Sequence, residues 1–228
     1  MTPHTYTVTL LSKKNIANQV LELRFSRPEN FNFLAGQFIQ IIPGNDSSIF
    51  RSYSLSSDPS EKYLELCVKV LPNGIVSSFL NTLQINDEIM FRGPFGRFTH
   101  AVSTMPLGFV ATGVGLAPIM SILEDELENK KNNNPLHLLF GVRNEEDIFW
   151  LERLELLHNN FSNFEYILTL SQPMNTWAGA QGRVYQYLDK LPQNARFFLC
   201  GSTEMVKDVR ALLVDRGTDV TSIHLEIF

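Results

Sequence analysis

The chain has 228 residues, a length that suits one large domain or two modest ones and excludes a small scaffold stabilised by disulfides. Apolar residues make up 44% of the chain and charged residues 19%, a composition typical of a compact globular protein and not of a disordered one. Nineteen Lys and Arg against 24 Asp and Glu give a net charge of -5, and no basic run is present. Nucleic acid and anionic membranes are therefore not expected partners.

The two cysteines, Cys67 and Cys200, are far apart and have no clustered histidines beside them. We therefore expect no metal site, neither structural zinc nor a cysteine-held iron–sulfur cluster, and any cofactor must be held by other residues. Residues 1–6 lack a basic segment followed by an apolar one, and about eighteen apolar residues nowhere run together. These features predict no membrane span and a cytoplasmic location.

Short alternating apolar segments fill the first hundred residues and predict strands. The predicted strands are residues 6–10, 20–25, 37–42, 50–56, 63–70 and 88–92. Residues rich in Pro, Gly, Asn and Asp supply turns at 28–30, 43–46, 58–60 and 72–74, and a short helix is expected near 76–83. This spacing predicts an all-β unit, a small antiparallel barrel or sandwich.

The pattern changes near residue 103, which predicts two domains, residues 1–102 and 103–228. In the second half, strands are predicted at 107–112, 136–142, 164–170, 196–200 and 222–227, with helices at 116–127, 148–157, 184–188 and 205–213. Five β/α alternations predict a five-stranded, parallel, doubly wound α/β sheet that binds its ligand where the strand order reverses. In the common order 3-2-1-4-5, the ends of the first and fourth strands border that crevice.

The segment that leaves the first of these strands is rich in glycine. Gly113 and Gly115 follow Thr112 and permit a tight turn that brings backbone close to a pyrophosphate, while Pro118 suits the first helical turn. Pro118 stands where the dinucleotide-binding pattern G-x-G-x-x-G has its third glycine, and a glycine-rich turn is also a common structural feature. Both interpretations are open.

Arg51, Ser52, Tyr53 and Ser54 form a second unusual segment. An arginine beside an aromatic ring and two small hydroxyls suits a ligand with an anionic group and a planar ring. An edge strand with a solvated arginine, a half-buried tyrosine and polar serines has the same sequence.

Three further features each have two interpretations. Residues 74–77 offer backbone N–H groups and the Ser77 hydroxyl to an anion, or form a turn with a serine cap. Cys200, at a strand end, is either a site residue or a small buried apolar one. Glu226 and Phe228 are either site residues or a solvated charge and a loose chain end.

Together, and in this order, these residues resemble the ferredoxin-NADP+ reductase superfamily of flavoproteins. The matching motifs are R-x-Y-S at 51–54, G-x-x-S at 74–77, G-P-F-G at 93–96, T-G-x-G-x-A-P at 112–118, C-G-S at 200–202 and E-x-aromatic at 226–228. The resemblance spans the whole chain and implies an antiparallel Greek-key barrel that binds FAD, followed by an α/β domain that binds NAD(P).

The resemblance also implies roles for individual residues. Arg51 would hold flavin phosphate, Tyr53 would stack on the isoalloxazine ring, and Ser54 would bond near flavin N5. Cys200 and Glu226 would lie beside the hydride-transfer centre, and Phe228 would cover the flavin ring, in keeping with a dry site for the reaction. Further cofactor-binding positions are Ser52, Val68, Gly74, Val76, Ser77, Thr112, Gly113, Gly115, Pro118 and Gly201.

Coenzyme choice stays open between NADH and NADPH. NADP-preferring relatives tend to place an arginine after the serine that ends the third strand, whereas here Gln172 follows Ser171. Arg143 and Arg183 fall where other relatives keep arginines near the 2′-phosphate, which guanidinium groups suit. Both are equally consistent with surface arginines, and residues 145–147 offer Arg143 acidic partners.

The leading hypothesis is an FAD-containing reductase that takes a hydride from NAD(P)H and returns single electrons to a separate carrier, such as ferredoxin, flavodoxin or an oxygenase component. The chain has no cysteine cluster of its own, so its one-electron partner is expected to be another molecule. Two alternatives are an NAD(P)H:flavin reductase that uses free flavin as substrate and an electron-transfer subunit without turnover. A monomer is expected.

Overall fold

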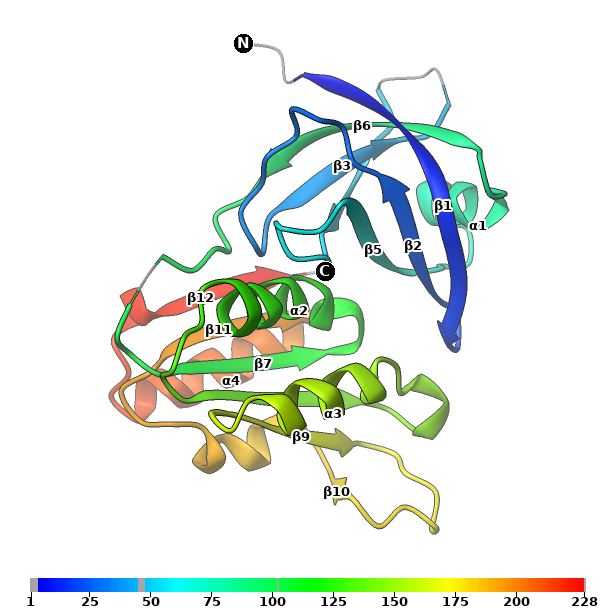
Figure 1. Ribbon diagram of the computed structural model, residues 1–228. Coiled ribbons are helices and arrows are strands. Elements are labelled where there is room, and N and C mark those ends of the chain that lie inside the picture. Colours follow the sequence, from blue (N-terminus) through cyan, green and yellow to red (C-terminus); the bar gives the residue numbers. More distant parts are fainter. Residues whose placement is uncertain (1–3, 45–47, 102, 228) are drawn as a thin grey trace.

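The computed structural model describes residues 4–44, 48–101 and 103–227, and Figure 1 shows an all-β half above an α/β half. The β half is one six-stranded antiparallel sheet in the order β4-β3-β6-β1-β2-β5. Its elements are β1 (Thr5–Ala17), β2 (Val20–Ser26), β3 (Phe38–Ile42), β4 (Arg51–Ser54), β5 (Tyr63–Lys69), α1 (Ile75–Thr82) and β6 (Glu88–Phe95). A bridge from Leu55 to Leu66 joins the two edges of the sheet and closes the barrel. The predicted barrel and its short helix are confirmed.

Strands β2 and β5 bury both of their faces. Leu21, Leu23 and Phe25 on β2 point into the barrel core. The alternate residue Val20 and Cys67 on β5 belong to the apolar core of the α/β half. Because Val20 and Cys67 on the outer face of this wall belong to the α/β core, the barrel packs against the second half of the chain through β2 and β5.

The α/β half is a parallel sheet in the order β10-β9-β8-β7-β11-β12. Its elements are β7 (Leu107–Thr112), α2 (Leu116–Glu124), β8 (Leu136–Val142), α3 (Leu151–Asn160), β9 (Phe164–Leu170), β10 (Ala180–Gln181), β11 (Arg196–Gly201), α4 (Thr203–Asp215) and β12 (Ile223–Ile227). The five predicted strands and their order are confirmed. The sheet separates two apolar cores, one under α2 and α3 and the other under α4, as a doubly wound sheet requires.

Four details differ from the sequence prediction. The sheet has a sixth strand, β10, whose two residues are too short for a periodic pattern. Residues 184–190 form a 3-10 helix where an α-helix was predicted, and α2 ends in a π-helical turn at Asp125–Asn129. Strand β1 also continues beyond Leu10, because the polar residues Lys13 to Asn15 pair with β2 in a long hairpin.

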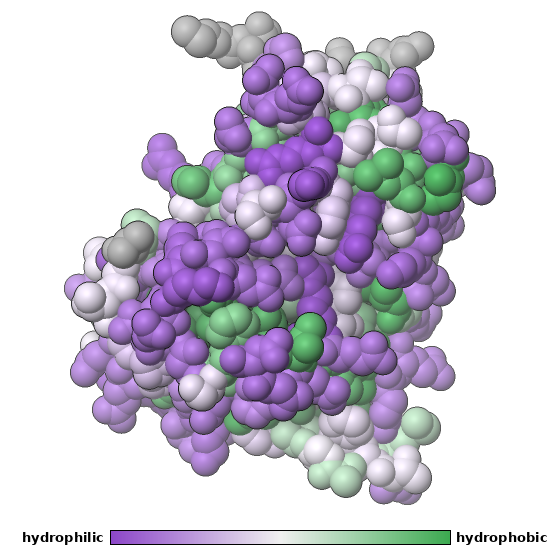
Figure 2. All heavy atoms as spheres, in the orientation of Figure 1, coloured by the Kyte–Doolittle hydropathy of each residue, from purple (hydrophilic) through white to green (hydrophobic). Residues whose placement is uncertain are grey.

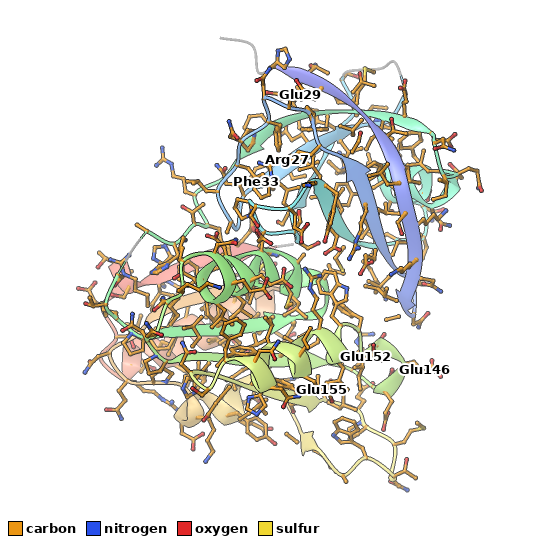
Figure 3. All side chains as sticks on the ribbon, in the orientation of Figure 1. Arg27, Glu29, Phe33, Glu146, Glu152 and Glu155 are labelled. Carbon is orange, nitrogen blue, oxygen red and sulfur yellow. The ribbon has the colours of Figure 1, made fainter. Side chains whose placement is uncertain are left out.

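The β1–β2 hairpin reaches the α/β half. The Asn18 amide at its tip donates to the Glu146 carbonyl at 3.1 Å, and Figure 3 shows the labelled Glu146 beside the end of the hairpin. Ile16 and Ala17 pack against the core that includes α2 and α3. In the described part of the chain, no helix is long and apolar enough to cross a membrane.

Candidate functional site

Strand β4 carries the R-x-Y-S segment along the edge of the barrel sheet. Arg51 and Ser52 are exposed, Tyr53 is half-buried, and Ser54 is buried. Burial raises the pKa of Tyr53 to about 12, although Arg51 partly opposes this shift, so the phenol stays neutral at physiological pH. The strand therefore presents one cation and one neutral aromatic ring at the same edge, the combination predicted for a ligand with a phosphate and a planar ring.

Helix α1 begins at Ile75, after Gly74, and Gly74 provides no side-chain cap. Its first amide groups have no partner within the helix, as at every helix N-terminus, and they carry partial positive charge. The Ser77 hydroxyl lies within 3.2 Å of the Leu71 amide and 3.4 Å of the Gly74 carbonyl, so it serves the local turn. Val76 and Val68 are buried in the barrel core, which leaves only their backbone groups for a ligand.

The glycine turn and the end of β11 meet at the carboxyl edge of the parallel sheet. A Cβ atom on Gly115 would lie 2.3 Å from the Cys200 carbonyl oxygen, so this position requires glycine. Gly113 has φ +54° and nothing within 4 Å of its Cβ direction, which leaves its backbone open to a ligand. The Thr112 hydroxyl accepts a hydrogen bond from the Ser202 amide at 3.2 Å and joins the two strand ends.

The two strand ends predicted to border the crevice are therefore neighbours in the sheet. Pro118 is the third residue of α2 and is buried. Gly201 has φ +146°, and a Cβ there would lie 2.2 Å from the Thr112 hydroxyl oxygen. Ser202 was not predicted as a site residue, although its position just before α4, as the cap that accepts from the Met205 amide, is a recognisable helix-start signal.

A hydrogen bond joins the barrel to the α/β half at Ser54. The Ser54 hydroxyl donates to Glu226 Oε2 at 3.1 Å, across 172 positions of sequence. Burial raises the pKa of Glu226 to about 7, with the Ser54 bond opposing the shift. Cys200 pairs with Glu226 in the register of β11 and β12, and burial with the nearby Glu226 charge raises the pKa of its thiol. Phe228 lies outside the described residues.

This geometry fits the two cofactors that the motifs imply. The exposed Arg51 suits a phosphate, the neutral Tyr53 ring suits a planar ring system, and the α1 N-terminus suits a second anionic group. The open backbone at Gly113 suits the pyrophosphate of a dinucleotide. Among the described residues, no group of three or more His, Cys, Asp or Glu side chains is arranged to hold a metal ion.

Comparison with known proteins agrees with this geometry. Residues 7–100 match the family model described as an oxidoreductase FAD-binding domain, and residues 109–211 match an oxidoreductase NAD-binding domain. NADH-cytochrome b5 reductase 1 from Aspergillus oryzae is 30% identical over 241 residues, which cover 96% of this chain and 82% of that protein. The chain belongs to the family of oxidoreductases that combine an FAD-binding domain with an NAD-binding domain.

Other members of this reductase family are longer. The electron transfer component of toluate 1,2-dioxygenase from Pseudomonas putida is 30% identical over 226 residues, which cover 97% of this chain and 65% of that protein. An Amycolatopsis cytochrome P450 reductase superposes with a TM-score of 0.90 at 25% identity, over 100% of this chain and 71% of that one. The chain thus spans less than two thirds of the dioxygenase component that it matches.

The two arginines expected near the coenzyme follow other strands of the parallel sheet, Arg143 after β8 and Arg183 after β10. Arg143 follows β8 and is exposed, and within the described ranges its guanidinium makes no ion pair, so the acidic residues at 145–147 are not its partners. Arg183 pairs with Glu204 of α4 at 2.7 Å, with both side chains largely exposed. Ser171 follows β9, and its amide donates to the Val142 carbonyl at 3.1 Å.

Proposed function

We propose that this chain is an NAD(P)H-dependent FAD-containing reductase that supplies single electrons to a separate redox partner, a ferredoxin, a flavodoxin or an oxygenase component. The observation that carries the proposal is the bond from Ser54 to Glu226, which brings the flavin-type strand and the nucleotide crevice to one point. Bound FAD supplies the chemistry of accepting a hydride from NAD(P)H and releasing its two electrons one at a time. The electron transfer components among the relatives support a separate partner.

The residues that bind FAD lie in the barrel, and those that bind the coenzyme lie in the α/β domain. Arg51 and the α1 N-terminus hold the phosphates of FAD, and Tyr53 packs against its ring. The turn from Thr112 to Gly115 holds the pyrophosphate of the coenzyme, because its open backbone offers N–H groups without a side chain in the way. The division between the domains falls between residues 102 and 103.

Ser54 and Glu226 hold and transfer a proton where the FAD site and the coenzyme site meet. A carboxyl group with a pKa of about 7 changes protonation state near neutral pH, which is the property of an efficient general acid or base. The Ser54 hydroxyl, 3.1 Å away, connects this carboxyl group to whatever lies against β4. The buried, protonated thiol of Cys200 fills the space beside them and keeps water out.

The charged residues near the proposed coenzyme site do not distinguish NADH from NADPH. The proposal therefore includes both coenzymes. Arg143 is available for a 2′-phosphate, whereas Arg183 is already paired with Glu204. A cytoplasmic location and a monomeric state complete the proposal.

Steady-state oxidation of NADH and of NADPH by the FAD-loaded chain tests this function, with ferricyanide as a one-electron acceptor and free FMN as a two-electron acceptor. The proposal predicts turnover with ferricyanide at a rate that does not depend on added free flavin. Turnover that rises in proportion to free flavin would favour the flavin reductase alternative. No oxidation of either nucleotide would favour a subunit without turnover.

A further inference from the structure

A cluster of buried charges lies between the two domains, away from the cofactor sites described above. At its centre is Arg153 of α3. Its guanidinium bonds twice to Glu124 of α2, through Nε to Oε1 and through Nη2 to Oε2, the latter at 2.6 Å. A third bond runs from Nη1 to Oε1 of Glu65, on β5 of the barrel, at 2.7 Å. One side chain therefore ties a helix of the nucleotide domain to a strand of the FAD domain.

The residues around Arg153 suit a guanidinium group. Glu65 is fully buried and Glu124 is 9% exposed, so an unpaired charge on either would be costly. The Arg153 guanidinium also lies 4.9 Å from the centre of the Trp150 ring, and Trp150 Nε1 donates to Glu22 on β2 at 2.8 Å. Planar, two-pronged bonding and stacking on an aromatic ring are properties of arginine that lysine lacks.

Burial alone would raise the pKa of Glu65, but the charges of Arg153 and Arg24 hold it below the usual range. The Arg24 Nε contributes through a bond of 2.9 Å to the second oxygen of Glu65. Glu65 therefore stays ionised and keeps its pairing with Arg153 at neutral pH. Burial raises the pKa of the other partner, Glu124, to about 7 although its bonds to Arg153 oppose the shift, so the bond to Glu65 is the part of the tie that stays ionic throughout the neutral range.

Each partner of Arg153 is linked to the proposed reaction centre through a neighbouring segment. On the barrel side, the Ser56 hydroxyl donates to Glu65 Oε1 at 3.0 Å, and Ser56 is two residues after Ser54. On the nucleotide side, Glu124 is the last residue of α2, and this helix begins directly after the glycine turn. Nine helical residues make a rigid rod of about 12 Å, so displacing one end displaces the other.

We propose that Arg153 is a positioning residue for hydride transfer, because it fixes the end of α2 against the strand segment that follows Ser54. This inference rests on the proposed function. Hydride transfer needs the reacting atoms within about 3–3.5 Å, and a displacement of about 1 Å costs roughly 100-fold in rate. Arg153 acts through Glu124 and Glu65, and other bonds between the domains, such as Ser121 to the Ser57 carbonyl at 2.7 Å, keep the chain assembled without it.

The test compares Arg153→Gln with Arg210→Gln, the same change at an exposed position on α4. Glu152 and Glu155, labelled in Figure 3, lie close to Arg153 on α3, and neither is substituted in these variants. Flavin reduction is followed by anaerobic stopped flow over a range of nucleotide concentrations, which separates the limiting rate from the nucleotide Kd. Backbone hydrogen exchange of the same proteins, without nucleotide, measures the interface directly and requires no turnover.

We expect Arg153→Gln to lower the limiting rate of flavin reduction at least tenfold while the nucleotide Kd changes less than threefold. Exchange at residues 55–57 and 121–125 becomes at least tenfold faster, and strands β7 and β8 keep their protection. Arg153→Lys recovers part of the rate, because lysine keeps the charge but loses the paired bonds. Arg210→Gln matches the wild type in every measurement.

A wild-type limiting rate in Arg153→Gln, or unchanged exchange at residues 55–57, overturns the inference. If this variant loses protection in β7 and β8 as well, it has unfolded, and Glu65→Gln is judged by the same two criteria. A wild-type protein that neither nucleotide reduces would refute the proposed function instead. The exchange data would then still decide whether Arg153 fixes the interface.

Discussion

Alanine at Gly115 gives the sharpest structural test of the nucleotide crevice. Gly115 has φ −61° and ψ −12°, a helical conformation that alanine adopts easily. In open space this substitution would stabilise the protein by about 0.4–1 kcal/mol, because it reduces the freedom of the unfolded chain. Because backbone atoms crowd the Cβ position of Gly115, we expect Gly115→Ala to destabilise the protein instead.

A Cβ atom at Gly115 would lie 2.3 Å from the Cys200 oxygen, 2.5 Å from the Cys200 carbonyl carbon and 2.7 Å from the Gly201 Cα. Ordinary contacts begin at 3.4 Å, so the closest atom must move by 3.4 − 2.3 = 1.1 Å. All three atoms are backbone atoms of β11, which is held between β7 and β12, and no side-chain rotation relieves the contact. Overpacking of this kind costs about 1–3 kcal/mol, and we expect the upper half of that range for Gly115→Ala.

Gly113→Ala is the matched control. Its φ of +54° costs alanine about 1–2 kcal/mol, but its Cβ direction meets nothing within 4 Å. This variant should therefore fold with an undisturbed β11 and bind nucleotide more weakly, because the new methyl group occupies the space that the pyrophosphate needs. Gly115→Ala should instead lower the limiting rate of flavin reduction, since it displaces Cys200 beside Glu226.

Urea denaturation and stopped-flow reduction of both variants measure these effects. Gly115→Ala should lower the free energy of unfolding by about 2–3 kcal/mol and slow the limiting rate. A Gly115→Ala protein as stable as the wild type, with an unchanged limiting rate, would show that the glycine turn does not pack on β11 as described.

Three further substitutions test individual site residues. Ser54→Ala should retain FAD but slow its reduction by about 100-fold, the lower end of the range for a lost proton-transfer partner, and an unchanged stopped-flow rate would contradict the role of this serine. Because burial raises the folded-state pKa of Glu226 to about 7, above its unfolded value, the wild type should lose stability as the pH rises from about 5 to 8. Glu226→Gln should remove this loss of about 1–3 kcal/mol in the free energy of unfolding between pH 5 and pH 8, measured by urea denaturation. Wild type and variant with the same dependence of stability on pH would refute the raised pKa of Glu226. Arg143→Ala should raise the KM for NADPH by about tenfold and leave the KM for NADH unchanged, as expected for one charged hydrogen bond to a 2′-phosphate, and equal effects on both coenzymes would exclude that contact.

The sequence predicts most of the fold because periodicity is a local property. Strands β7, β8 and β9 begin and end at their predicted residues, and the crevice between β7 and β11 follows from the rule for parallel sheets. Strand β10 and the hairpin extension of β1 were missed. Two residues carry no period, and the polar hairpin is held by pairing with β2 and by contacts with the other domain.

The candidate site depends more on contacts that no local pattern encodes. Ser54 and Glu226 are brought together across the whole chain, and only the resemblance to a family predicts that they meet. The sequence left two interpretations open for the Ser77 hydroxyl, an anion ligand or a turn cap, and in the structure it bonds within its own turn. Arg153 gives no signal in the sequence, because its importance depends on where the barrel packs against the second domain.

The surface adds little to the assignment of a partner. Figure 2 shows a largely hydrophilic face with separate hydrophobic areas over both halves of the molecule. Exposed apolar side chains such as Leu34, Leu71 and Ile75 are scattered over the barrel. Isolated residues of this kind are normal on protein surfaces, so the redox partner has to be identified by electron-transfer experiments.

The central claim is that this one chain binds FAD and that a pyridine nucleotide reduces it in place. A visible spectrum of the desalted protein, followed in the same cuvette by anaerobic titration with NADH and then NADPH, tests that claim most directly. We predict a yellow protein with flavin absorbance that survives desalting and is bleached by a stoichiometric amount of at least one nucleotide. A colourless protein that neither nucleotide reduces, even after FAD is added, would contradict the account.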